Sequence, residues 1–316
     1  MDLPEPVRSA LDTLPAPRTV VVAVVVSLGL IALLVTVLVA TGVLAQPTVE
    51  RIDSQWGEAT NETTQIETQA IVDNPNPIGI PGVVSVEYTA SLNDIVLVDN
   101  EKSGIGLSPG KNTIEFTAAM DNDRIVDWWV THINGDERST MTIEPTVSGP
   151  GVSQSLPDQT SDIETDLLAG LNTAEPQPVG TSDREYFTAE STSVEWGEAT
   201  PQVAPLDIRS TLRNEQPVPI TIREISYDVS IGGVTLANGS QDDGTTIGPG
   251  ESGVVDPTID LDNSRMDEWW VSHVENGERS TLSVDAWATI EAGGQTETVP
   301  LSMFATNETV ETDLLG

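Results

Sequence analysis

The chain contains one long stretch of sequence twice, and this duplication constrains its fold more than any other feature. Residues 56–60 and 196–200 both read Trp-Gly-Glu-Ala-Thr, and residues 164–168 and 311–315 both read Glu-Thr-Asp-Leu-Leu. Between these landmarks, a Pro-Gly turn and a Trp-Trp-Val-x-His segment recur in the same order at a nearly constant offset. Copies of this length are typical of tandem domains, because solenoid repeats have only about 20–50 residues.

An apolar segment without charged residues precedes the first copy and runs from Thr19 to Ala45. A helix of about 20 apolar residues crosses a bilayer, and the core of a signal peptide has only about 7–15, so the segment predicts an uncleaved transmembrane helix. Arg8 and Arg18 precede it, whereas only Arg51 follows closely. The positive-inside rule then predicts a single-pass protein of the cell membrane, with its domains outside the cell.

The predicted organisation has five segments, because a stretch between the copies has the proline and glycine content of a linker. The expected order is a short cytoplasmic segment at residues 1–18, the transmembrane helix at 19–45, the first domain at 46–170, the linker at 171–185 and the second domain at 186–316.

The composition is strongly acidic, with 50 Asp plus Glu against 13 Lys plus Arg and a formal net charge of -37. Such a chain repels nucleic acid and anionic lipid headgroups, so neither is an expected partner. Disorder is an alternative at this charge, but 38% of the residues are hydrophobic and they alternate with polar ones in many short runs. Molar salt shortens the Debye length to about 3 Å, so we interpret the charge as adaptation to a salty solvent. Because the chain has no cysteine, it forms no disulfide or thiolate site.

Outside the Trp-Trp segments, each copy is expected to be mainly β. Residues 65–72 and 83–88, and their counterparts at 205–212 and 220–225, combine apolar and polar positions as half-buried strands do. Turn signals such as Asn-Pro-Asn-Pro and Asn-Gly separate these runs. Short strands between such turns favour an antiparallel β-sandwich.

The Trp-Trp segment of the first copy changes the period from strand to helix. Apolar and histidine side chains recur at the spacing of one helix face: Ile125, Trp128, Trp129, His132 and Ile133. Asp121 or Asn122 is a candidate N-cap, and Gly135 is a candidate left-handed stop. We expect a helix of about three turns that covers one open end of the sandwich, where two buried indoles contribute several kcal/mol at about 25 cal/mol per Å².

The second copy repeats this face and this stop. The corresponding residues are Met266, Trp269, Trp270, His273 and Val274, followed by Gly277. The two segments together hold four of the seven tryptophans and both histidines of the chain.

His132 and His273 are the candidate catalytic or metal-ligating residues. Each domain has one histidine and no cysteine, so a packed or capping histidine near the helix end is favoured, where its charged form would suit the helix dipole. Ser139 and Ser280 follow closely, but no Gly-x-Ser-x-Gly motif supports a nucleophilic triad.

Other polar motifs are also interpreted as structural, and no metal or cofactor is expected. Paired carboxylates that could hold calcium lack the EF-hand spacing, so we interpret them as solvated acidic loops. Arg138 and Arg279 follow the helix in both copies and are expected to form ion pairs. The paired carboxylates are Asp121 and Asp123, Asp242 and Asp243, and Asp260 and Asp262; the possible glycosylation sites are Asn61, Asn238 and Asn307.

The order of these motifs resembles that of the late embryogenesis abundant (LEA) type 2 proteins, also called LEA14-like, whose domain is the water stress and hypersensitive response (WHy) domain. The first copy carries Asn74, Pro75 and Asn76, then a strand, a Pro-Gly turn and one helix before the last strands. The second copy keeps Asn214 and Pro217 but has Glu-Gln between them. The acidity and the Trp-Trp-Val-x-His helix look like the versions of this family in halophilic archaea.

The resemblance implies a fibronectin-III-like sandwich and a role in protecting cells or proteins during desiccation or osmotic stress. The predicted fold class is therefore mainly β, with an N-terminal transmembrane helix followed by two tandem immunoglobulin- or fibronectin-III-like β-sandwich domains, each with one short helix. The expected function is that of a non-enzymatic, membrane-anchored stress protein with unidentified protein or membrane-surface partners. The alternatives are a cell-surface binding or adhesion module and, less favoured, an enzyme.

Overall fold

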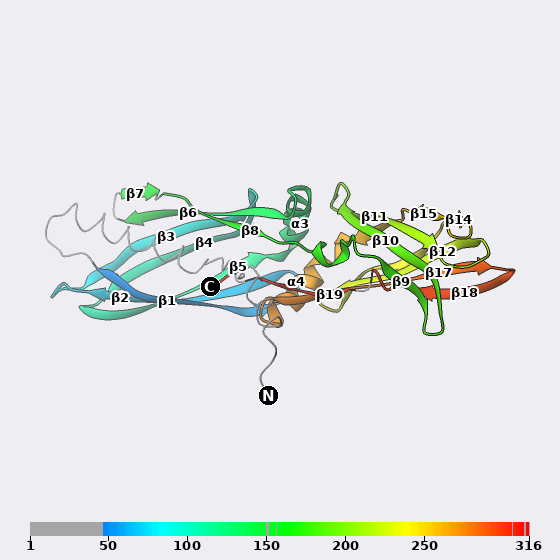
Figure 1. The fold of residues 1–316 in the computed structure, drawn as a ribbon. Coiled ribbons are helices and arrows are strands. Elements are labelled where there is room, and N and C mark those ends of the chain that lie inside the picture. The colour runs from blue at the N-terminus through cyan, green and yellow to red at the C-terminus, as the bar shows by residue number, and fades with distance from the viewer. Residues whose placement is uncertain (1–46, 150–151, 156, 305, 313, 316) are drawn as a thin grey trace, which may run out of the picture.

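The computed structural model describes residues 47–149, 152–155, 157–304, 306–312 and 314–315. Two β-rich domains lie end to end in an elongated molecule, and the helices α3 and α4 lie at its centre, where the domains meet (Figure 1). The prediction of a mainly β chain with tandem sheets is confirmed.

The predicted fold class is wrong in its transmembrane helix. Residues 19–45 lie outside the described residues, and within the described part of the chain no helix is long and apolar enough to cross a membrane. The two α-helices there have ten residues each, so each is about 15 Å long, half the thickness of a bilayer core.

The described residues of the first domain form eight strands and one α-helix. In chain order these are β1 (Thr48–Ala59), β2 (Thr63–Asn74), β3 (Ile80–Leu92), β4 (Ile95–Leu107), β5 (Gly110–Asp121), the 3-10 turn η1 (Asn122–Arg124), α3 (Ile125–Asn134), β6 (Arg138–Gly149), β7 (Val152–Ser155) and β8 (Gln159–Glu164).

The second domain repeats this order after the turn η2 and an additional strand, β9. Its elements are η2 (Ala169–Leu171), β9 (Gln177–Thr181), β10 (Arg184–Trp196), β11 (Val203–Asn214), β12 (Ile220–Ile231), β13 (Val234–Asp242), β14 (Thr246–Ile247), β15 (Ser252–Val255), β16 (Thr258–Asp262), η3 (Asn263–Arg265), α4 (Met266–Glu275), β17 (Arg279–Ala292), β18 (Gln295–Pro300) and β19 (Thr306–Glu311).

Each domain has two antiparallel layers around an apolar core. In the first domain the strand order is β1-β2-β5-β4-β3-β6-β7, with β8 also paired to β6. Strands β4 and β5 share a single residue pair, Val98 with Met120, and the sheet divides there. Ala70 and Phe116 from one side pack in the same cluster as Val86 from the other. The second domain has two separate sheets, β15-β11-β10-β9 and β13-β12-β17-β18.

The segment expected to be a linker, residues 171–185, is largely part of the second domain. It contains β9, which pairs with β10, and Val179 is fully buried. β9 lies at the edge of its sheet, and edge strands tolerate a proline such as Pro178 because one row of their backbone N–H groups is unpaired. A proline-rich edge strand therefore has the same composition as a linker.

A glycine in the left-handed conformation was expected after each helix, and only α4 is followed by one. Gly277 has φ +68, as expected of a left-handed stop, whereas Gly135 has φ -95. The left-handed residues that follow α3 are Asp136 and Glu137, both with φ +56. Asp136 therefore occupies the position that Gly277 occupies in the second copy.

This difference predicts that Asp136→Gly stabilises the protein. The left-handed conformation costs a residue with a Cβ roughly 1 kcal/mol, and glycine avoids this cost while it adds some entropy to the unfolded chain. We expect a gain of about 0.5 kcal/mol in the free energy of unfolding, measured by chemical denaturation. The matched substitution Gly277→Asp should lower it by about 1 kcal/mol. Equal effects of the two substitutions would contradict this assignment.

Candidate functional site: the tryptophan–histidine interface

Six of the seven tryptophans of the chain meet at the contact between the two domains, which we call the helix interface. Four come from α3 and α4, and Trp56 and Trp196 come from β1 and β10. Trp56 packs edge-on against Trp270, with ring centroids 5.8 Å apart, and Trp196 packs edge-on against Trp129 at 5.9 Å. Each strand tryptophan thus contacts the helix of the other domain. Edge-to-face pairs of this kind contribute about 0.5–1.5 kcal/mol beyond their burial.

A chain of hydrogen bonds runs from α3 of the first domain to a buried glutamate. Trp128 Nε1 donates to Ser139 Oγ at 2.9 Å, and Ser139 Oγ lies 2.9 Å from His132 Nδ1. His132 Nε2 lies 2.9 Å from Thr165 Oγ1, whose hydroxyl donates to Glu137 Oε2 at 2.7 Å. His132 is 2% exposed and Glu137 is 6% exposed.

The partners of the two hydroxyls determine the direction of the hydrogen bonds to His132. Ser139 Oγ accepts from Trp128 Nε1 and also from Asn93 Nδ2 at 3.1 Å, which uses both of its lone pairs, so its hydroxyl donates to His132 Nδ1. Because the hydroxyl of Thr165 donates to Glu137, Thr165 Oγ1 accepts from His132 Nε2. This order requires a neutral imidazole. Burial lowers the pKa of His132 to about 4, which agrees with the neutral form.

The second domain contains the same chain with equivalent residues. Trp269 Nε1 donates to Ser280 Oγ at 2.9 Å, and Ser280 Oγ lies 2.8 Å from His273 Nδ1. His273 Nε2 lies 2.9 Å from Thr312 Oγ1, which donates to Glu278 Oε2 at 3.0 Å. Burial lowers the pKa of His273 to about 4 as well. Both histidines are therefore neutral at pH 7 and do not supply the positive charge that would suit the helix dipole.

Each buried glutamate also accepts a hydrogen bond from a tryptophan of the other domain. Trp196 Nε1 donates to Glu137 Oε1 at 2.8 Å, and Trp56 Nε1 donates to Glu278 Oε1 at 2.6 Å. The other oxygen of Glu137 also accepts from the backbone N–H of Leu167. We call the two hydrogen-bonded series, Trp128–Ser139–His132–Thr165–Glu137 and Trp269–Ser280–His273–Thr312–Glu278, the histidine chains. Through the tryptophans of the opposite domain they cross the helix interface in opposite directions and connect the two domains.

The sequence analysis did not select these glutamates or threonines. A signal was present, since Glu137 and Glu278 begin the repeated Glu-Arg-Ser-Thr motif, and Thr165 and Thr312 lie in the repeated Glu-Thr-Asp-Leu-Leu motif. Polar residues that are identical in both copies and follow in the same order indicated shared buried contacts.

The histidine chains do not present an open active site. Ser139 and Ser280 are each 3% exposed, and both hydroxyls are engaged by an indole and an imidazole. The space between the helices is an apolar cavity of about 30 Å³, lined by four indoles and both imidazoles among other side chains. Neither Ser139 nor Ser280 lines this cavity. Within the described ranges, no group of three or more His, Cys, Asp or Glu side chains could hold a metal ion.

The asparagines of the family motif lie at the ends of the sandwiches remote from the helix interface, where they organise a turn. Asn74 Nδ2 donates to the carbonyls of Ile78 and Ser108, both at 3.3 Å, and its Oδ1 accepts from Asn76 Nδ2 at 2.7 Å. Pro75 is exposed beside them.

The second copy holds its turn in the same way. Asn214 Nδ2 donates to the carbonyls of Val218 and Ile247, both at 2.9 Å, and Pro217 is exposed. Gln216, which replaces the second asparagine, still donates its backbone N–H to Asn214 Oδ1 at 2.8 Å.

The arginines that follow the helices form exposed ion pairs across neighbouring strands. Arg138 lies 3.0 Å from Glu164, and Arg279 lies 3.2 Å from Glu311. Exposed pairs of this kind contribute about 0–1 kcal/mol.

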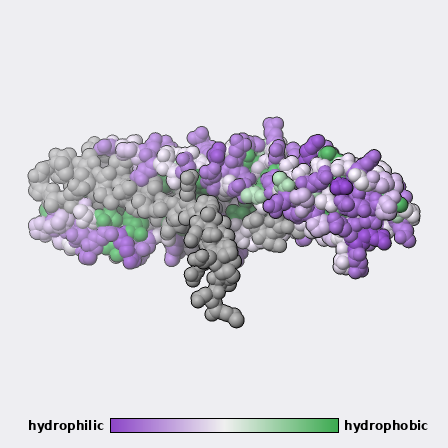
Figure 2. All heavy atoms as spheres, in the orientation of Figure 1, coloured by the Kyte–Doolittle hydropathy of each residue, from purple (hydrophilic) through white to green (hydrophobic). Residues whose placement is uncertain are grey.

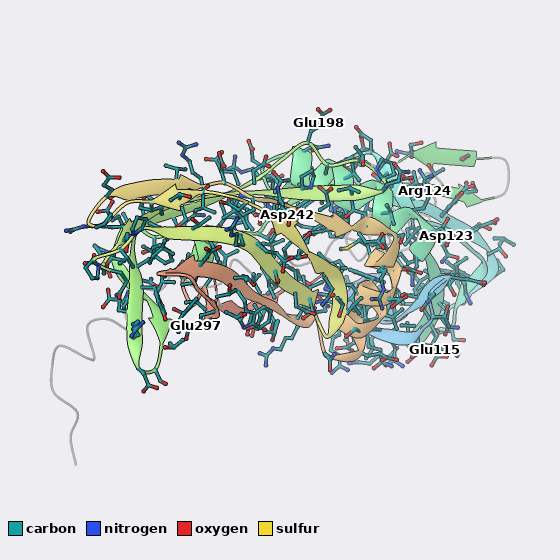
Figure 3. All side chains as sticks on the ribbon, turned by 90° about the vertical axis from the view of Figure 1, so that its right-hand side faces the viewer. Glu115, Asp123, Arg124, Glu198, Asp242 and Glu297 are labelled. Carbon is teal, nitrogen blue, oxygen red and sulfur yellow. The ribbon has the colours of Figure 1, made fainter. Side chains whose placement is uncertain are left out.

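Acidic side chains cover the surface of both domains. In Figure 2 the visible atoms of the described residues are mostly hydrophilic, with small hydrophobic areas between them. Figure 3 shows acidic side chains from both domains directed away from the ribbons; the labelled ones are Glu115, Asp123, Glu198, Asp242 and Glu297. Beside the helix interface, an open groove of about 990 Å³ is lined by several carboxylates, among them Glu195 and Glu198.

Part of the chain is similar to known proteins. A family model described as late embryogenesis abundant protein, LEA type 2, matches residues 209–304. An uncharacterized protein of Methanocaldococcus jannaschii is 33% identical over 90 residues, which are 28% of this chain and 52% of that protein. The chain thus spans about half the length of this relative.

Two solved structures are similar to part of the chain. A crystal structure of a protein from Archaeoglobus fulgidus is 30% identical with a TM-score of 0.36, over 39% of this chain and 97% of that one. A solution structure from Arabidopsis thaliana is 10% identical with a TM-score of 0.27, over 38% of this chain and 80% of that one.

The family match begins in β11 and includes α4 and β17 of the second domain. The first domain repeats these elements in the same order and carries the same histidine chain. The second domain therefore belongs to the late embryogenesis abundant family of type 2, and the first domain repeats its order of elements.

Proposed function

We propose that this chain is a non-enzymatic protein that protects other macromolecules when water becomes scarce or salt concentrated. Its family suggests a stress-related role. The observation that carries the more specific proposal is the surface: the net charge is -37, and the carboxylates labelled in Figure 3 extend from both domains into solvent.

The physical basis is that ionised carboxylates bind water strongly and lose it reluctantly. A surface covered with them keeps a hydration layer and repels its neighbours, so the protein separates other molecules that would otherwise aggregate. In dilute solution the same charge destabilises the folded chain, whereas in molar salt the repulsion is screened over about 3 Å. The folded chain is therefore most stable in concentrated salt, which is the condition in which protection is required.

The buried interface supports the same proposal. Its histidine chains are closed hydrogen-bonded networks that connect the domains, and their hydroxyls are buried. This arrangement favours a structural over a catalytic role.

The proposal predicts that the chain preserves a labile enzyme during drying. We expect the activity recovered after drying and rehydration to rise several-fold when the protein is present in molar salt. The matched control is a variant with four substitutions at exposed positions: Glu115→Gln, Asp123→Asn, Glu198→Gln and Asp242→Asn. This variant has fewer negative charges and should therefore protect the enzyme less.

Equal protection by this variant or by an unrelated neutral protein would contradict the role of the acidic surface. If neither form protects but crosslinking captures one specific partner, and Glu195→Gln with Glu198→Gln in the groove abolishes that capture, a binding or adhesion module becomes the better assignment.

A further inference from the structure

The two halves of the helix interface are copies of each other. Trp56 of the first domain donates to Glu278 of the second, and Trp196 of the second donates to Glu137 of the first. The indole pairs Trp56–Trp270 and Trp129–Trp196 both have an interplanar angle of 88°. The domains are therefore related at this contact as the subunits of a symmetric dimer are.

Each domain consequently carries both a donor and an acceptor of this contact. The second domain has the donor Trp196 and the acceptor Glu278, and α4 presents Trp269 and Trp270 between them. Two copies of the second domain, placed as the two domains are now, would pair Trp196 of each with Glu278 of the other.

The contacts that differ between the halves also allow this pairing. Trp129 Nε1 donates to Asn263 Oδ1 at 3.0 Å, whereas the equivalent Trp270 donates to Thr64 Oγ1 at 3.1 Å. The second domain has Ala204 in place of Thr64, but it retains Asn263. In a pair of second domains, Trp270 of one copy would reach Asn263 of the other, as Trp129 does now.

The present pairing also leaves one buried acceptor without a partner. Asn122, the equivalent of Asn263, is fully buried and its Oδ1 accepts no hydrogen bond, because Trp270 donates to Thr64 instead. An unpaired buried carbonyl is costly. The present contact between unlike domains therefore leaves one buried carbonyl oxygen without a donor. A pair of second domains would not, because Trp270 of each copy would donate to Asn263 of the other.

One contact does favour unlike domains. Asn134 at the end of α3 exchanges two hydrogen bonds with the backbone of Ala199, at 2.9 and 2.8 Å. The equivalent residue of α4 is Glu275, whose carboxylate cannot donate to a carbonyl. Glu275→Asn would supply this donor to a pair of second domains.

We propose that the surface formed by α4, Trp196 and Glu278 is a homotypic recognition surface whose partner, besides the first domain, is a second copy of the second domain. Two chains can then associate by exchanging domains through the same contacts that hold one chain together. The inference rests on the geometry of the helix interface and is independent of the proposed protective function.

The test begins with the full chain, folded in molar salt, with a protease site inserted between Glu175 and Pro176, both exposed. After cleavage of the folded protein, the two fragments should remain associated, as measured by native mass spectrometry. Separation of the fragments should then yield dimers of the second domain, and Glu275→Asn should increase their fraction.

A matched variant uses the symmetry of the contact. Trp196→Phe removes one indole hydrogen bond from the pair of unlike domains but two from the pair of second domains. We expect association to weaken about tenfold in the first case and about a hundredfold in the second. The proposal is overturned if the second domain, with and without Glu275→Asn, stays monomeric or unfolds at concentrations at which the unlike fragments associate. Equal weakening of both pairs by Trp196→Phe also overturns it.

Discussion

Replacing Trp270 with alanine is expected to lower the free energy of unfolding by about 4 kcal/mol, the largest effect of any single substitution considered for this protein. Trp270 is among the largest fully buried side chains and lies at the centre of the helix interface. Its ring packs against Trp56 at 5.8 Å and Trp128 at 6.4 Å, and its Nε1 donates to Thr64. The substitution leaves a cavity, and it also removes the N–H group that donates to the buried hydroxyl of Thr64.

The effect should extend to the first domain, because the three partners of Trp270 just named belong to it. Chemical denaturation in molar salt, followed by circular dichroism, measures the loss in the whole molecule. The control is Trp287→Ala on β17, which removes an indole that is 38% exposed and should cost about 1 kcal/mol or less. If the two substitutions cost the same, or if Trp270→Ala leaves the unfolding of the first domain unchanged, the helix interface does not couple the domains.

The sequence predicted the helix faces of this interface well, and the reason is local. Trp128, Trp129 and His132 recur with the period of a helix, and this period depends only on neighbouring residues. The strands were predictable for the same reason, since alternation of apolar and polar residues is also a local pattern.

What covers each helix face could not be predicted from the pattern. A periodic apolar face shows that a helix is buried, but it does not identify the surface against which it packs. We expected each helix to cover the end of its own sandwich, whereas α3 and α4 also pack against each other. Trp56 and Trp196 were recognised as landmarks of the duplication, but their hydrogen bonds span 222 and 59 residues along the chain.

The buried glutamates were missed because their residue type argues against burial. Glutamate is almost never fully buried unless it is paired, and in a chain with 50 acidic residues one more carboxylate carries no signal. Glu137 and Glu278 differ from the exposed carboxylates in their burial and in their indole and hydroxyl partners. Both properties are visible only in the folded chain.

Lowering the pH from 7 to 5 is expected to destabilise the protein through its two histidines. In the unfolded chain each histidine has a pKa of about 6.5, and in the folded chain burial lowers the pKa of His132 and His273 to about 4. Between these values the unfolded chain binds more protons, so stability falls as the pH falls. The contribution of the neutral histidines is complete above pH 6.5 and is lost progressively down to pH 4. At pH 5 the loss is about 2 kcal/mol for each histidine.

The negative charges around the histidines must be separated from this trend. Glu137 and Glu278, each one hydroxyl away from a histidine, favour a charged imidazole, but burial outweighs them. Molar salt screens the repulsion among the exposed carboxylates. Measurements between pH 7 and 5 in molar salt therefore isolate the histidines.

The chain offers a direct check, because His132 and His273 are its only histidines. Their two imidazole signals in an NMR titration should remain those of the neutral form down to about pH 5, since the folded-state pKa of each is about 4. His273→Gln should lower stability at pH 7 and halve the dependence of the free energy of unfolding on pH, because one titrating group remains. A wild-type stability that does not change between pH 7 and 5 would contradict the assignment, and so would an unaltered slope in His273→Gln. Either result would show that the two imidazoles are not buried in their neutral form.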